Sequence, residues 1–214
     1  EVGRILTALA EQGLDENTLV LFSADHGDFL GDHHLFMKFW PYDAAGRIPL
    51  IVRAPGLAPG RTQAPASHLD FAPTFLDFCG RDIPETCQGR SLLELARGQA
   101  ETREGVVMKF GGDHGFCLVT RRHKYTVWPS GEEELFDTTK DPEEANNLSA
   151  QLRDVRDELR ESLVRCLRRF DAERLDPMPA LFGPDGLVID TTRVGAYEGL
   201  RRRFMHHRTP SRLD

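Results

Sequence analysis

The apolar stretch Thr18-Leu19-Val20-Leu21-Phe22 is followed directly by Ser23-Ala24-Asp25-His26-Gly27-Asp28-Phe29-Leu30-Gly31-Asp32-His33-His34-Leu35-Phe36-Met37-Lys38. The first segment is a short apolar run with a β-branched centre, bounded by turn residues, which is typical of a buried strand. Asp25 and His26 then stand at the carboxyl end of that strand, the edge at which open α/β sheets bind their ligands. This stretch therefore predicts an α/β fold with a ligand site directly behind the strand.

The residue types behind the strand indicate half of a metal site for an anionic substrate. Asp25 and His26 offer an oxygen and a nitrogen ligand, and Gly27 permits the backbone turn that lets both reach one divalent cation. Lys38 supplies a compact positive charge suited to the oxygens of a sulfuryl or phosphoryl group. Each also has a purely structural alternative: Asp25 as a helix cap, His26 as a buried hydrogen-bonded imidazole and Lys38 as a solvated lysine.

The other polar residues of this stretch are expected to shape the loop. Asp28 and Asp32 are expected to accept hydrogen bonds from nearby backbone amides. His33 and His34 are expected either to contact the substrate or to order the loop, and His33 is the one assigned to substrate binding. Arg47, further on, is expected to hold the loop through a carboxylate partner.

The first part of the chain, residues 1 to 98, has the alternation of helix and strand that typically feeds a parallel sheet. A helical apolar face at the start ends at Gly13, a plausible C-terminal cap. The other expected elements are a strand over 48–53, a helix over 70–79 and a short helix over 92–96, with a Pro- and Gly-rich link over 54–62.

Residues from about 104 to 137 contain short apolar runs at close spacing, which predict an antiparallel meander. Apolar residues then recur at steps of three and four from Leu148 to Phe170, so we expect one amphipathic helix covering a face of that sheet. From residue 176 to 214 the pattern dissolves into an irregular, Arg-rich tail.

The composition excludes several classes of protein. The 214-residue chain has 40% hydrophobic and 29% charged residues, enough for a sizeable core, and no run approaches a membrane span. A net charge of -7 argues against a nucleic-acid partner. The four cysteines fit neither a zinc finger nor a disulfide scaffold, although Cys79 and Cys87 are close enough in sequence to be bridged; free thiols are the favoured interpretation.

The motifs together resemble the second half of a sulfatase of the alkaline-phosphatase superfamily. The resemblance covers roughly residues 1 to 170 and rests on the order of short motifs. These motifs are Asp25-His26-Gly27, Gly31-Asp32-His33, Lys38, Tyr42, Arg47-Ile48-Pro49, Asp70-Phe71-Ala72-Pro73-Thr74, Gly80, Gly89-Arg90-Ser91, Lys124-Tyr125, Glu134-Leu135-Phe136-Asp137, Asp141-Pro142 and Asn146-Asn147-Leu148.

The resemblance implies a fold and a division into domains. Residues 1–98 would form the C-terminal part of an alkaline-phosphatase-like α/β domain, a mixed sheet flanked by helices. Residues 99–175 would form a small antiparallel α+β subdomain, with the Arg-rich tail over 176–214. The family's Cys/Ser-x-Pro-x-Arg motif, whose first residue becomes formylglycine, and its early pair of aspartates are not in this chain. We therefore expect a C-terminal part that lacks the nucleophile and is inactive alone.

The implied activity is metal-dependent hydrolysis of sulfate esters, with a small-molecule sulfate or phosphonate ester as substrate. Asp25 and His26 would be metal ligands, Lys38 would be catalytic and substrate-binding, and His33 would contact substrate. Calcium is the expected metal, with manganese or magnesium as alternatives. Many family members have Asn in place of His26, and its presence here is shared with relatives that act on phosphonate monoesters.

Three other interpretations stay open. The chain can belong to a phosphonate monoester or phosphodiester hydrolase of the same superfamily, to a phosphoryl-transfer enzyme with a Ser or Thr nucleophile, or to an inactive sulfatase-like module. No membrane span is expected, homo-oligomerisation stays open, and a leader peptide can be neither seen nor excluded. The sequence leaves the localisation undecided.

Overall fold

The structure is a computed structural model that describes residues 1–98, 103–110, 115–128, 130–172, 182–183 and 186–187. Two compact units divide the chain. Unit 1 consists of Glu1–Asp25 and Ile48–Val106, and unit 2 consists of His26–Arg47 and Val107–Asp214. The segment 26–47 thus packs with residues that come much later in the sequence. The boundary predicted near residue 98 stays a prediction, and most of the predicted tail lies outside the described residues.

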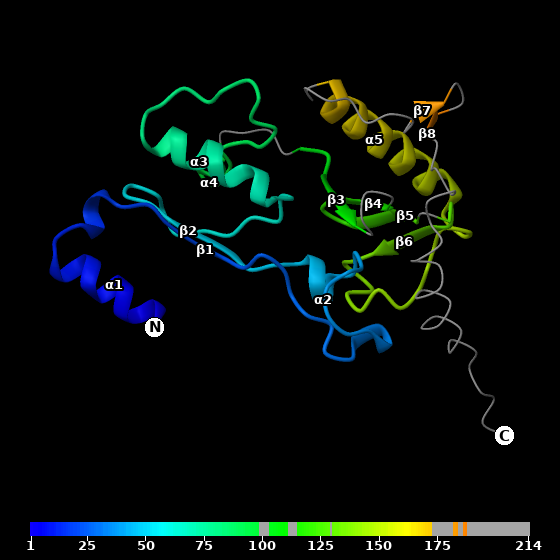
Figure 1. Cartoon of the computed structure of the whole chain (residues 1–214), viewed down its shortest axis with the longest axis horizontal. Helices are drawn as coiled ribbons and strands as arrows, with labels where there is room; N and C mark the ends of the chain where they lie inside the picture. Colours follow the sequence, from blue (N-terminus) through cyan, green and yellow to red (C-terminus); the bar gives the residue numbers. More distant parts are fainter. Residues whose placement is uncertain (99–102, 111–114, 129, 173–181, 184–185, 188–214) are drawn as a thin grey trace. The chain divides into compact units, whose positions relative to one another are not determined.

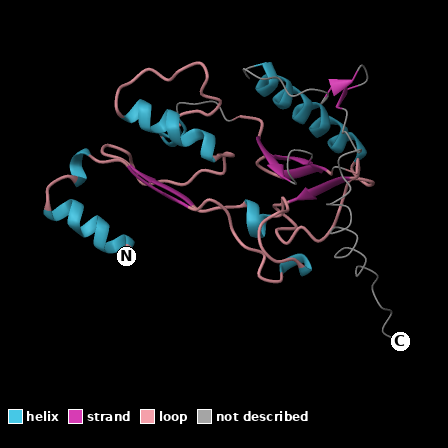
Figure 2. Cartoon of the chain, in the orientation of Figure 1, coloured by secondary structure: helices cyan, strands magenta, loops and turns pink. Residues whose placement is uncertain are grey.

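Unit 1 contains most of the helices and strands predicted for the first part of the chain (Figures 1 and 2). Its first helix closes as predicted: Gly13 has φ +65°, its N–H donates to Ala10 and the Leu14 N–H donates to Leu9. The elements are α1 (Val2–Glu11), η1 (Asp15–Asn17), β1 (Val20–Ser23), β2 (Leu50–Arg53), η3 (His68–Asp70), α3 (Phe71–Phe78) and α4 (Leu92–Ala96).

The two strands of unit 1 pair antiparallel, so the expectation of parallel pairing was wrong for them. In their register Ser23 lies opposite Leu50 and Val20 lies opposite Arg53. The chain therefore leaves β1 and re-enters β2 at the same end of the pair. A connection that crosses to the opposite end is what a parallel pair requires, and residues 24–49 do not make one.

The buried carboxylate of Asp70 explains two of the sequence motifs in unit 1. It accepts hydrogen bonds from the N–H groups of Ser67 at 2.8 Å and Arg90 at 2.9 Å, and it pairs with Arg103. Gly89 touches the same turn, because a Cβ atom there would overlap the carbonyl oxygen of Leu69. Asp70 and Gly89 are therefore structural partners.

Unit 2 is built around the predicted meander, a four-stranded sheet in the order β3-β4-β5-β6. Strands β4, β5 and β6 pair antiparallel with their sequence neighbours. The elements are η2 (Asp32–His34), α2 (Asp43–Gly46), β3 (Val106–Phe110), β4 (Gly115–Val119), β5 (His123–Val127), β6 (Glu133–Asp137), α5 (Arg153–Ala172), β7 (Phe182–Gly183) and β8 (Gly186–Leu187).

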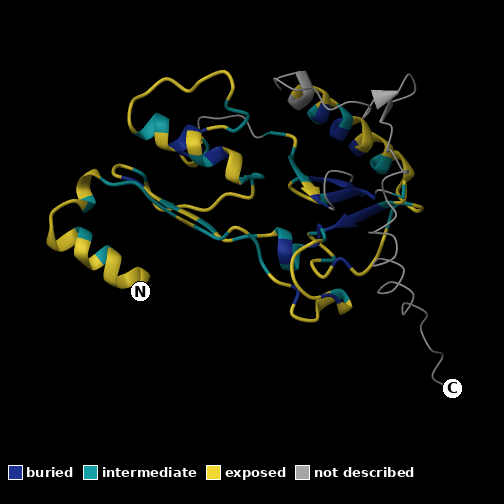
Figure 3. Cartoon of the chain, viewed as in Figure 1, coloured by how far each residue is buried: buried dark blue, intermediate teal, exposed yellow. Residues whose placement is uncertain are grey.

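Alternation along the strands gives this sheet two covered faces. The helix α5 lies along one face of the sheet, as Figure 1 shows. The side chains packed between this face and α5 include Phe116, Leu118, Tyr125, Val127 and Leu135. The intervening side chains Cys117, Trp128 and Phe136 pack with Phe29, Leu35, Tyr42 and Ala45 from segment 26–47. The sheet is accordingly among the most buried parts of the unit (Figure 3).

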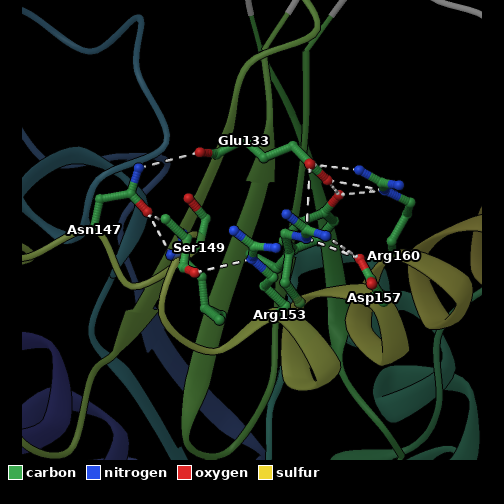
Figure 4. Close-up of polar contacts among 10 residues, drawn as sticks. Glu133, Asn147, Ser149, Arg153, Asp157 and Arg160 are labelled. Carbon is green, nitrogen blue, oxygen red and sulfur yellow. Dashed lines mark hydrogen bonds and ion pairs between the residues drawn. The ribbon is translucent and has the colours of Figure 1, made fainter.

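The helix α5 begins at Arg153, later than the predicted start at Leu148. The intervening residues serve the edge of β6: the Leu148 N–H donates to Leu135, and the Asn147 side chain both accepts from the Leu135 N–H and donates to the Glu133 carbonyl. Figure 4 shows Asn147 beside this strand, and Arg160 of α5 paired with the Glu133 carboxylate. The hydrogen bonds that these residues make to the edge of β6 therefore keep them out of the helix, although their apolar spacing is helical.

Among the helices in the described part of the chain, none has the length and apolar character needed to cross a membrane.

Candidate active site

The loop that follows β1 is closed on itself and anchored in unit 2. The Phe29 N–H donates to the Met37 carbonyl at 3.0 Å, and the Gly31 N–H donates to the Leu35 carbonyl at 2.9 Å. Phe29 and Leu35 are buried in the core, 1% and 7% exposed. Asp28 Oδ1 accepts from the Leu30 and Met37 N–H groups, which confirms its predicted structural role. Backbone bonds and two apolar anchors thus fix both ends of the loop.

The structure brings two of the predicted site residues together. Lys38 Nζ lies 2.5 Å from His26 Nε2, and His26 Nδ1 lies 2.6 Å from the Gly27 carbonyl oxygen. A carbonyl oxygen can only accept, so Nδ1 carries the proton and the neutral ring presents the Nε2 lone pair to the ammonium. His26 and Lys38 therefore meet as predicted, with an imidazole lone pair directed at a cation.

Asp25 and His26 are consecutive residues that fall in different units. The backbone just before Asp25 is tied within unit 1, where His68 Nε2 lies 2.8 Å from the Ala24 carbonyl oxygen. The tightly packed turn after it belongs to unit 2: a Cβ atom at Gly27 would overlap the Ala44 carbonyl oxygen, and the Gly27 N–H donates to Ala45. Position 27 thus has room only for glycine, because the backbone of Ala44 lies against it.

His33 lies on the loop and stacks on the ring of Tyr42, with 4.2 Å between centroids and 11° between the planes. His33 and His34 both have positive φ, +52° and +58°. These contacts fit the loop-ordering alternative for His33, while its assignment to substrate binding stays a prediction. Arg47 pairs with Asp43 at 3.6 Å, as expected for a loop anchor.

A buried ionic cluster next to this loop was missed by the sequence reasoning. Lys124 of β5 is 1% exposed, pairs with Glu144 at 2.5 Å and also pairs with Asp43. Lys124-Tyr125 stood among the family motifs, but no role was assigned to the lysine. The sequence did indicate that this lysine is buried: Lys124 precedes the apolar Tyr125 in a strand, so the two side chains point to opposite faces of the sheet.

Electrostatics keep the lysine of this cluster charged. Burial alone would lower the pKa of Lys124, but negative neighbours that include Glu144 and Asp43 raise it above its ordinary value. Burial raises the pKa of Glu144, against the opposing attraction of Lys124. Nearby, burial raises the pKa of the Cys117 thiol to about 12, so this cysteine is an inert packing residue.

The donor chemistry of His26 fits a metal ligand. Metal-bound imidazoles commonly donate their other ring N–H to a carbonyl or carboxylate, which is the bond that His26 makes to Gly27. Within the described ranges, no three His, Cys, Asp or Glu side chains are grouped so that they could hold a metal ion. The predicted ligand pair Asp25 and His26 therefore stays a prediction: the bond from Nδ1 to Gly27 suits a ligand, but the Nε2 lone pair that would bind the metal faces Lys38 in this structure.

Comparison with known proteins gives consistent matches. Residues 31–169 match the family described as N-sulphoglucosamine sulphohydrolase, C-terminal. An arylsulfatase of Clostridium perfringens is 37% identical over 78% of this chain and 37% of its own length. A choline-sulfatase of Rhizobium meliloti is 33% identical over 92% of this chain and 40% of its own length.

Solved structures agree with these sequence matches. A phosphonate monoester hydrolase from Silicibacter pomeroyi superposes with a TM-score of 0.66 and 29% identity, covering 89% of this chain and 42% of that one. The chain thus spans well under half the length of these relatives, and its fold is that of sulfatases with the alkaline-phosphatase-like architecture. Because the family match covers most of the chain, the chain belongs to the sulfatase family, as its C-terminal region.

Proposed function

We propose that the protein carrying this chain hydrolyses sulfate esters in a metal-dependent reaction, with Lys38, His26 and Asp25 as this chain's contribution to the active site. The observation that carries the proposal is the Lys38 ammonium held against His26 Nε2 on a loop anchored at both ends. An ammonium fixed in this way is suited to oxygens that gain negative charge as a sulfuryl group is transferred.

Each residue has a defined task in this proposal. Asp25 and His26 would hold a divalent cation, with calcium expected and manganese or magnesium as alternatives, once Lys38 has turned from His26 Nε2 to the substrate. His33 contacts the substrate. When bound, the cation neutralises non-bridging oxygens of the ester and lowers the pKa of the nucleophile. Lys38 adds a second positive charge from the protein side. The nucleophile, expected to be formylglycine, is not in this chain, so residues 1–214 alone are expected to be inactive.

One observation supports an alternative class of substrate, and another argues against an inactive protein. The match to a phosphonate monoester hydrolase over 89% of the chain favours phosphonate monoesters or phosphodiesters as substrates. Lys38 suits a sulfate ester and a phosphonate ester alike, because both present anionic oxygens to the ammonium. An inactive sulfatase-like module is the remaining alternative, and it is at odds with an intact pairing of His26 and Lys38.

The test uses the full-length protein with a 4-nitrophenyl sulfate and a 4-nitrophenyl phenylphosphonate as substrates. Lys38→Ala should lower kcat by about 10²- to 10³-fold, the usual effect of losing one donor to a developing anion. Lys38→Arg should restore little, because a planar guanidinium cannot occupy the place of a compact ammonium. Lys140→Ala, at an exposed lysine elsewhere in unit 2, is the matched control.

Metal content provides the second arm of the test. His26→Ala and Asp25→Ala should each lose bound metal together with turnover, whereas Lys38→Ala should keep its metal. Full metal occupancy in either ligand variant would remove that residue from the proposed ligand pair. An unchanged kcat in Lys38→Ala would refute the proposed role of the lysine, and the ratio of the two substrates decides between sulfate and phosphonate esters.

A further inference from the structure

The buried ionic cluster of unit 2 is directed at the backbone of one short segment. Lys124 Nζ donates to the Pro41 carbonyl oxygen at 3.1 Å and also pairs with the Asp43 carboxylate. Glu144 accepts from the Asp43 N–H at 2.6 Å and pairs with Lys124 at 2.5 Å. The cluster thus holds Pro41 by its backbone carbonyl and Asp43 by its N–H and its carboxylate. These two residues directly follow the loop of residues 26–40, which carries Lys38.

Tyr42, between the two held residues, connects the cluster to the loop. Its side chain is 1% exposed, and its hydroxyl donates to the Glu134 carboxylate, whose two oxygens each lie 3.1 Å away. Its ring stacks on His33 of the loop. The segment around Tyr42 is therefore fixed from β5, from β6 and from the loop at once.

Backbone strain occurs at both ends of this arrangement. In the described part of the chain, the non-glycine residues with positive φ are confined to the loop, at Leu30, His33, His34 and Met37, and to Glu144 of the cluster. Left-handed conformations cost free energy for such residues and persist only where the surrounding contacts over-determine them. The cluster holds the residues on either side of Tyr42, and Tyr42 supplies a contact of this kind to His33 of the loop.

Stability alone is a weak reason for burying these charges. Replacing a buried ion pair by apolar residues of similar volume is often neutral or stabilising, because burying charge is costly. The charged groups do hold specific atoms in place, since two of their bonds each fix one backbone group, the Pro41 carbonyl and the Asp43 N–H. Such a device is valuable where a side chain must be held to within a fraction of an ångström.

We propose that Lys124, Glu144 and Asp43 are positioning residues, which fix the loop of residues 26–40 and so hold Lys38 where it meets the transferring group. The inference rests on the proposed function for its kinetic consequence, but the positioning itself is a property of unit 2. Lys124 and Glu144 are each 1% exposed and contact Pro41 and Asp43, so in this proposal they act through Lys38.

A double-mutant cycle separates positioning from general destabilisation. In the full-length protein, Glu144→Gln should lower kcat/KM by about 10- to 100-fold, since small misplacements of a catalytic group have effects of this size. In a Lys38→Ala background the same change should cost less than about threefold, because the group that it positions is already gone. A loss of folded protein would instead lower the rate by the same factor in both backgrounds.

Glu133→Gln is the matched control. Glu133 also pairs with a cation in unit 2, Arg160 of α5, but its partners lie on the α5 side of the sheet. Glu133→Gln should change kcat/KM by less than about twofold at temperatures where the variant is folded. Asp43→Asn keeps the Lys124–Glu144 pair and serves as the second test variant if Glu144→Gln does not fold.

Hydrogen exchange gives a readout that needs no activity. Amides of residues 28–38 should exchange faster in Glu144→Gln or Asp43→Asn than in the wild type, while Glu133→Gln should leave them unchanged. Unchanged protection of this loop, or equal losses of kcat/KM in both Lys38 backgrounds, would overturn the proposal. If the wild type hydrolyses neither ester, the proposed function fails, and the exchange result still decides whether the cluster positions the loop.

Discussion

Replacing Asp70 by Ala should destabilise the protein strongly while sparing its chemistry. The carboxylate is fully buried, accepts from the N–H groups of Ser67 and Arg90 and pairs with Arg103. Removing one partner of a buried ion pair typically costs about 3–5 kcal/mol, and each stranded buried donor adds about 1–3 kcal/mol. Ser67 is half-buried and Arg90 is exposed, so water can reach part of this set. We therefore expect a loss of about 3 kcal/mol, at the lower end of these values.

The measurement is chemical denaturation of full-length wild type, Asp70→Ala and the control Asp82→Ala, followed by steady-state kinetics well below the unfolding midpoint. Asp82 is an exposed aspartate of the same unit, and its replacement should change the free energy of unfolding by less than about 0.5 kcal/mol. Asp70→Ala should have a near-normal kcat once folded, because its bonds serve the turn at residues 67–70 and 90. Unchanged stability together with a lost kcat would refute this reasoning and place Asp70 in the active site.

Two further predictions concern backbone approach and pH. Gly89→Ala should cost more than about 3 kcal/mol, because the new methyl group would overlap the Leu69 carbonyl, whereas Gly60→Ala has open space and should be near neutral in the same unfolding experiment. Hydrogen bonds from Arg122 and Thr139 hold the pKa of Asp137 well below its usual range. Its contribution to stability is therefore present above the ordinary Asp pKa of about 3.9 and is lost as the pH falls below it. Unfolding free energies from pH 6 downward should thus converge for wild type and Asp137→Asn, and a constant difference would contradict the assignment.

Local sequence patterns were sufficient to predict a helix or strand wherever the residues of that element specify it. The short apolar runs at close spacing that predicted β4, β5 and β6 belong to a sheet with apolar side chains packed on both faces, and the period of three and four in α5 reflects a helix on one of them. The closure of α1 at Gly13 follows from the freedom of glycine at positive φ. The Asp25-His26-Gly27 motif and Lys38 were identifiable because their residue types carry the chemistry.

Local sequence patterns were insufficient wherever a residue distant in sequence decides where an element begins or what it contacts. The helix predicted from Leu148 begins at Arg153, because the edge of β6 binds the preceding residues. The strands β1 and β2 pair antiparallel because the long connection between them returns to the same end, which no local signal encodes. Asp70 and Gly89 stood as separate motifs, and only folding shows that they meet in one turn.

Residue type and local period were enough to identify the types of element, the sulfatase resemblance and the residues able to bind a cation or an anion. The contact between Lys38 and His26 became visible only in the folded chain, and so did the buried cluster of Lys124, Asp43 and Glu144. Such contacts depend on distance in space, which the order of residues along the chain does not encode. Asp43 and Glu144 are brought to the same lysine by the burial of apolar side chains on both faces of the sheet.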